Sequence, residues 1–120
     1  MNLDVQPGYF ESLADVMDDI KTNGTWPTTF VSGRSEGLPV HWHGEEIHVY
    51  VMEGETDFLD AERDIRLPVA AGDKVVIPAR ALHAEGAVHD RVVYVLALPE
   101  PVSQDKFLLM REPSELTEVS

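Results

Sequence analysis

The sequence predicts an all-β domain, a barrel or a sandwich of antiparallel strands, preceded by one short helix. After Gly24, apolar residues no longer recur at helical spacing, and short runs rich in Val, Ile, Phe, Tyr and Thr replace them. Gly, Pro and Asp separate these runs at regular intervals, which is typical of barrels and sandwiches. The 120 residues are enough for one domain with its own core.

The helix is predicted over residues 9–21. Its apolar residues recur every three or four positions and form one stripe: Phe10, Leu13, Met17 and Ile20. Asn23 and Gly24 follow, and both residue types tolerate the left-handed conformation that ends helices. We expect this helical segment, residues 1–27, to pack on one face or edge of the sheets.

A series of short strands is predicted after the helix. They cover residues 28–31, 40–43, 47–52, 56–59, 65–69, 74–77, 83–85, 92–98 and 106–110. Pro39, Pro68 and Pro78 fall at strand ends or edges, where a missing backbone donor is tolerated. The barrel is therefore expected over residues 28–111, followed by a polar, acidic tail over 112–120.

The composition excludes several kinds of site and partner. The chain has no Cys, so a metal ion must be bound by His, Asp or Glu. Asp and Glu number 22 against nine Lys and Arg, and a net charge of −13 would repel nucleic acid. Neither a signal peptide nor an apolar run of about 18 residues is found, so we expect a soluble, cytoplasmic protein with no membrane partner.

Histidines are concentrated in the segment 41–48. Residues two apart on a strand point to the same face, so His41 and His43 can aim side by side into a barrel, with Trp42 pointing outward. Neutral imidazole is the commonest protein ligand for transition metals, and this pair therefore predicts a metal site. His89 lies in an expected hairpin turn and is predicted to be solvated.

With these residues in view, the chain resembles the cupin family. The family's first motif contains His-x-His followed at fixed spacing by Gly, which corresponds here to His41, His43 and Gly54. Its second motif contains Gly, Pro and His, which correspond to Gly72, Pro78 and His83. The resemblance extends over residues 35–98 and includes both motifs in order.

The resemblance implies an antiparallel double-stranded β-helix, or jelly-roll barrel, with a metal site at its mouth. It implies that His41, His43 and His83 bind one divalent transition-metal ion. Zn, Fe, Ni, Mn and Cu all accept such ligands, and the sequence does not select among them. Small cupins commonly pair, so the resemblance also implies a homodimer, and the apolar segment 106–110 would otherwise leave an unpaired edge.

The sequence departs from the family pattern at the acidic ligand. With four intervening residues after His43 the ligand position is His48, whereas with six intervening residues before Gly54 it is Ile47, which cannot bind metal. Glu46 is an alternative if a bulge shifts the register of the strand. The third possibility is that no fourth protein ligand exists. The apolar residues that alternate with His48 would normally face the core, and His48 and Glu46 would then both face away from it. We prefer His48, so the predicted ligand set is His41, His43, His48 and His83.

Three further family positions are changed, to Ser35, Arg80 and Ala87. Arg80 is expected to face solvent, although it could also bind a carboxylate near the barrel mouth. Glu85 follows His83 by two residues and would point into the same cavity. It would orient a ligand, act as a base, or simply lie at the rim.

The predicted function is that of a small metal-binding cupin. We expect a metal-dependent dioxygenase, isomerase or lyase that acts on a small oxygenated compound bound at the metal. Four neutral imidazoles would leave the ion its full charge, which favours an anionic ligand. The alternatives are a non-catalytic module that binds or senses a small ligand, and a structural cupin with a vestigial site, because fold alone does not give function.

Overall fold

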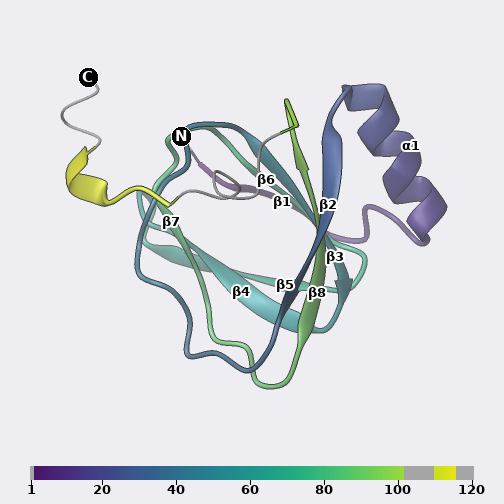
Figure 1. The fold of residues 1–120 in the computed structure, drawn as a ribbon. Coiled ribbons are helices and arrows are strands. Elements are labelled where there is room, and N and C mark those ends of the chain that lie inside the picture. The colour runs from purple at the N-terminus through teal and green to yellow at the C-terminus, as the bar shows by residue number, and fades with distance from the viewer. Residues whose placement is uncertain (1, 102–109, 116–120) are drawn as a thin grey trace.

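The computed structural model describes residues 2–101 and 110–115, which form two antiparallel sheets and one α-helix (Figure 1). The larger sheet has the strand order β1-β6-β3-β8-β2, and the smaller has the order β5-β4-β7. The strands are β1 Asp4–Gln6, β2 Trp26–Ser32, β3 Ile47–Glu53, β4 Glu55–Asp60, β5 Ile65–Ala70, β6 Lys74–Ile77, β7 His83–Glu85 and β8 Val92–Leu98. A 3-10 turn covers Pro113–Glu115. The predicted antiparallel all-β fold with a short N-terminal helix is confirmed.

The core lies between the two sheets, and strand parity decides which residues enter it. Along β3, Ile47, Val49 and Val51 are buried in this core, whereas His48 and Tyr50 lie on the opposite face of the strand. Other core side chains come from strands of both sheets: Phe58, Val69, Val75, Ile77, Val92, Tyr94, Leu96 and Leu98; Leu3, Ala81 and Val88 join them from outside the strands. The apolar alternation along β3 therefore sets the register of the sheet.

Helix α1, Leu13–Asn23, covers the outer face of the larger sheet (Figure 1). It begins at Ser12, whose side chain caps the helix, and ends at Gly24, which has a φ of 67°. Val16 and Ile20 are its buried residues and belong to a second cluster with the sheet residues Tyr50, Val95 and Ala97. No helix in residues 2–101 or 110–115 has the length and apolarity to cross a bilayer.

The predicted apolar stripe of the helix is partly wrong. Leu13 and Met17 are 55% and 40% exposed, and Phe10 is buried but precedes the helix. The Ser12 cap starts the helix later than predicted, and Val16 rather than Met17 then turns toward the sheet. Asp19 shares this side of the helix with Val16 and Ile20 and contacts the sheet residues Lys74 and Tyr50.

The structure differs from the prediction at two strands, and a third predicted strand is not tested. Residues 40–43 form no continuous strand, and only isolated bridges join His41 to His83 and Trp42 to Arg111. Strand β1, which pairs with β6, was not predicted, because three residues are too few to display alternation. The predicted strand 106–110 lies outside the described residues except for Met110.

Candidate metal centre

Three histidines and one glutamate converge inside the fold: His41, His43, His83 and Glu85. One potential ligand atom from each of these residues lies within 4.8 Å of all the others. The imidazole ring centroids are 4.5 Å apart for His41 and His83, 4.9 Å for His41 and His43, and 5.2 Å for His43 and His83. The structure thus brings together three of the predicted ligands with a carboxylate whose role the sequence left open.

Backbone pairing places these side chains. His41 and His83 form an antiparallel bridge, in which each backbone N–H donates to the other's carbonyl at 2.9 and 3.0 Å. The carbonyl of His43 accepts a hydrogen bond of 2.9 Å from the backbone N–H of Arg80. His83 and Glu85 stand two residues apart on β7 and therefore share one face of that strand.

Arg80 occupies the position at which the family pattern has Gly, and its backbone explains that preference. Its φ is 68°, in the left-handed region that costs an ordinary L-residue about 1–2 kcal/mol. The side chain is exposed, as expected. The turn nevertheless keeps its shape, and the Arg80 backbone N–H remains bonded to the site residue His43.

We expect Arg80→Gly to leave the stability unchanged or to raise it by up to about 1 kcal/mol, because relief of backbone strain offsets the greater flexibility of the unfolded chain. Arg80→Val should instead lower it by about 1 kcal/mol or more, since β-branched residues avoid positive φ. Urea denaturation of the two variants measures the difference. A Gly variant less stable than the Val variant would contradict this account of the turn.

Hydrogen bonds to the backbone orient two of the imidazoles. Nδ1 of His41 lies 2.8 Å from the carbonyl of Pro39, and Nδ1 of His83 lies 2.8 Å from that of Ala81. Because a carbonyl only accepts, each Nδ1 carries the proton, and each Nε2 presents a lone pair. Both Nε2 atoms are buried, and neither has a hydrogen-bond partner among the described residues.

Burial keeps the imidazole of His83 neutral. Burial lowers the pKa of His83 to about 3, and the neighbouring His41 and His43 contribute to this lowering. The hydrogen bond to the Ala81 carbonyl acts in the opposite direction. Burial also raises the pKa of the Glu85 carboxyl, although His41 acts in the opposite direction. Oε2 of Glu85 lies 3.3 Å from Nε2 of His41 but makes no hydrogen bond in the described part of the chain.

These residues fit a divalent transition-metal ion. Ligand atoms that share an ion at bond lengths of about 2.0–2.2 Å lie roughly 3–4 Å apart, so small side-chain movements suffice here. Nitrogen donors with one carboxylate are a common set for such ions, and backbone carbonyls already hold the second nitrogen of two imidazoles. An ion would also satisfy the buried Nε2 and Oε2 atoms that lack partners.

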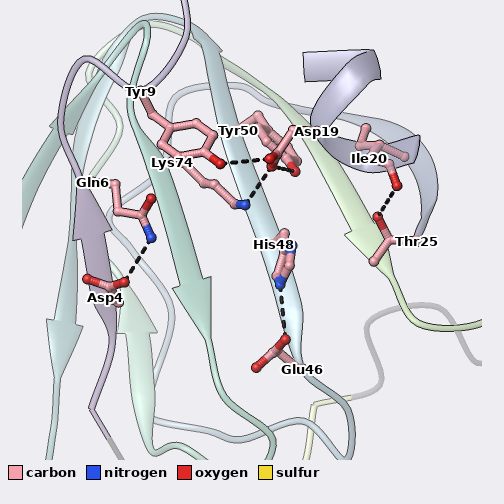
Figure 2. Close-up of polar contacts among 10 residues, drawn as sticks. All are labelled: Asp4, Gln6, Tyr9, Asp19, Ile20, Thr25, Glu46, His48, Tyr50 and Lys74. Carbon is pink, nitrogen blue, oxygen red and sulfur yellow. Dashed lines mark hydrogen bonds and ion pairs between the residues drawn. The ribbon is translucent and has the colours of Figure 1, made fainter. Parts of the chain in front are cut away.

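The structure does not bring His48 into this group, which corrects its predicted position. His48 lies on the outer face of β3, where its Nε2 is 3.0 Å from Oε2 of Glu46, a largely exposed residue (Figure 2). Ile47 instead turns inward and lines the cavity at the site. The physical reason is parity: the apolar set on β3 takes the core, so the intervening residues must face outward.

A cavity of about 280 Å³ adjoins three of the four residues. His41, His43 and Glu85 form part of its wall, and most of the remaining wall is apolar, including Phe30, Phe58, Tyr94 and Leu96. Phe30, Leu38 and Met110 line the cavity and are also 41%, 43% and 49% exposed, so its mouth lies among them. His89 is exposed at a bend and belongs to neither the cluster nor this cavity.

No protein-family model matches the sequence, and no curated protein matches it. Solved structures do match the fold. A DUF861 family protein from Thermotoga maritima has a TM-score of 0.56 at 13% identity, covering 80% of this chain and 98% of that one. A cupin-2 domain protein from Shewanella frigidimarina has a TM-score of 0.53 at 22% identity, covering 67% of this chain and 72% of that one.

Two further matches are to enzymes. The polyketide cyclase RemF from Streptomyces resistomycificus has a TM-score of 0.55 at 23% identity, covering 78% of this chain and 68% of that one. The DMSP lyase DddQ from Ruegeria pomeroyi has a TM-score of 0.57 at 18% identity, covering 68% of this chain but 41% of that one. Identities this low establish a shared fold and nothing finer.

Proposed function

The chain has the cupin fold, and we propose that it binds one divalent transition-metal ion and uses it to transform a small oxygenated or anionic compound. The proposed ligands are His41, His43, His83 and Glu85. One observation carries the proposal: buried ligand atoms that have no hydrogen-bond partner among the described residues converge beside the wall of a cavity. A purely structural metal site would be closed, whereas this one adjoins space for a second molecule.

The chemistry follows from the charges of the side chains. A bound ion of this kind polarises a substrate oxygen or activates dioxygen. Three neutral imidazoles and one carboxylate leave a divalent ion with one uncompensated positive charge, which favours an anionic oxygen ligand. The backbone carbonyls of Pro39 and Ala81 hold the imidazoles of His41 and His83 in place. The apolar wall of the cavity limits access of water.

The fold is compatible with turnover as well as with simple binding. A polyketide cyclase and a DMSP lyase share the fold, although the substrate of neither is carried over to this chain. A non-catalytic binding module remains the alternative, and it would release the same ligand unchanged. The predicted homodimer and the cytoplasmic location stay predictions.

The proposal is tested by metal content and by product formation. Protein incubated with Zn, Fe, Ni, Mn or Cu salts and then dialysed should retain about one ion per chain by elemental mass spectrometry. Metal-loaded and chelator-treated samples are then incubated with small oxo acids, enols and phenols, and the mixtures are compared by mass spectrometry. Loss of a compound only in the loaded sample supports an enzyme. Retention of no metal would refute the proposal.

A further inference from the structure

The charges around the cavity restrict what can occupy it. No Lys or Arg of the described residues lines the cavity, and the only charged lining residue beyond the imidazoles is Glu85, itself a proposed ligand. A ligand anion held between the metal centre and the mouth would therefore be buried without a counter-charge from the described residues, which is strongly unfavourable. A single anionic group is accommodated only at the end formed by His41, His43 and Glu85.

The rest of the wall suits a flat or branched hydrocarbon body. The ring of Tyr94 lies 6.3 Å from that of Phe30 and 6.4 Å from that of Phe58, measured between centroids. Aromatic walls contact ring edges and faces favourably, and each 100 Å² of buried apolar surface contributes about 2.5 kcal/mol. A volume of about 280 Å³ is just below the usual range for small-molecule sites, about 300–1,000 Å³, and so fits one ring rather than several.

The lining offers few hydroxyl groups to sugars and other polyols. Ser32 donates its hydroxyl to the carbonyl of Gly33 at 3.1 Å, and the hydroxyl oxygen of Ser35 accepts from the backbone N–H of Gly37 at 3.0 Å. Ser32 therefore keeps only acceptor capacity for a ligand, and Ser35 keeps its one donor. The Tyr94 hydroxyl has no such partner among the described residues and can serve one neutral polar group. A polyol would leave most of its hydroxyls unpaired against the apolar wall.

We propose that the ligand of this site is a monoanion with an oxygen-donor head and an uncharged, ring-sized apolar body. The head lies at His41, His43 and Glu85, and the body lies against the aromatic wall of Phe30, Phe58 and Tyr94. Sugars, phosphate esters and dicarboxylates should therefore bind more weakly than such a monoanion. This inference rests on the proposed metal centre and adds the substrate class to it.

A series of α-keto acids with the same head and different bodies tests the inference. Benzoylformate has the ring, pyruvate lacks it, and 4-carboxybenzoylformate adds a second charge to it. Calorimetric titration of metal-loaded protein should give benzoylformate at least a ten-fold lower Kd than either of the others. Equal or tighter binding of pyruvate or of the dicarboxylate would overturn the inference. Metal content is measured on the same samples. Samples that hold metal but bind the wrong ligand refute this inference alone, whereas samples that hold no metal refute both the metal site and the inference.

A charge introduced at the mouth of the cavity provides the second test. Leu38→Lys places a cation on the lining of the cavity. Ile65→Lys is the control, because Ile65 is similarly exposed (40%, against 43% for Leu38) but does not line the cavity. Leu38→Lys should tighten binding of 4-carboxybenzoylformate at least ten-fold relative to benzoylformate, and Ile65→Lys should leave the ratio unchanged. Equal ratios in the two variants would contradict a buried, uncharged body site.

Discussion

Replacing His41 and His83 together with alanine will abolish metal binding, whereas replacing His48 with leucine will leave it intact. The double substitution removes two imidazoles whose buried Nε2 atoms face Glu85 and His43. His48 lies on the other face of β3, bonded to Glu46, and contributes nothing to the cluster (Figure 2). Elemental mass spectrometry should show metal falling from about one ion per chain to below about a tenth in the double variant.

Glu85→Gln is the third variant, and it measures the contribution of the carboxylate to metal binding apart from that of the histidines. It keeps the shape of the side chain but removes the charge, so we expect metal affinity to fall by a factor of roughly 10–100. Circular dichroism of each variant checks that the sheets are still formed. Unchanged metal content in the double variant would refute the proposed centre. Loss of metal in His48→Leu would restore the ligand set predicted from the sequence.

Asp19→Ala will destabilise the protein by about 3–5 kcal/mol, because it leaves the charge of Lys74 buried and unpaired. Lys74 is only 4% exposed, and its Nζ lies 2.6 Å from Oδ2 of Asp19 (Figure 2). The hydroxyls of Tyr50 and Tyr9 donate to the same carboxylate at 2.6 and 2.7 Å. One carboxylate thus joins helix α1 to strands β3 and β6.

Urea denaturation measures this effect, and a matched double variant controls for it. Asp19→Leu with Lys74→Met removes both charges and should recover most of the lost stability, since an apolar pair needs no solvation. Such a loss would be a large share of the roughly 5–15 kcal/mol that stabilises a typical domain. A change below about 1 kcal/mol in Asp19→Ala would mean that Lys74 reaches solvent without cost.

The same carboxylate makes stability depend on pH. Burial alone would raise the pKa of Asp19, but hydrogen bonds from Lys74, Tyr50 and Tyr9 outweigh it and lower this pKa from 3.8 to about 2. A lowered folded-state pKa means that the stabilisation is complete above pH 3.8 and is lost as the pH falls toward 2. The Asp19→Leu, Lys74→Met variant should lose this part of the acid dependence.

Much of the fold follows from local sequence pattern. Strands β6, β7 and β8 have the bounds predicted from alternation and from flanking Gly, Pro and Asp residues. The segment around His41 did not become a strand, because its backbone pairs only singly with His83 and Arg111. Strand β1 is too short to carry a pattern and exists through its pairing with β6. These differences concern pairing between distant segments, which composition does not encode.

The sequence by itself predicted the fold class from the pattern of short strands and the His41/His43 pair from its two-residue spacing, both of which are local properties, and the resemblance to the cupin family added His83. Only the tertiary structure decided the fourth member. His48 and Glu85 both stand at a plausible spacing, but the core claimed Ile47, Val49 and Val51 and turned His48 outward. Burying three apolar side chains contributes more free energy than placing one imidazole at the site, so packing decided which face of β3 turns inward. Glu85, on β7, is the fourth member of the cluster.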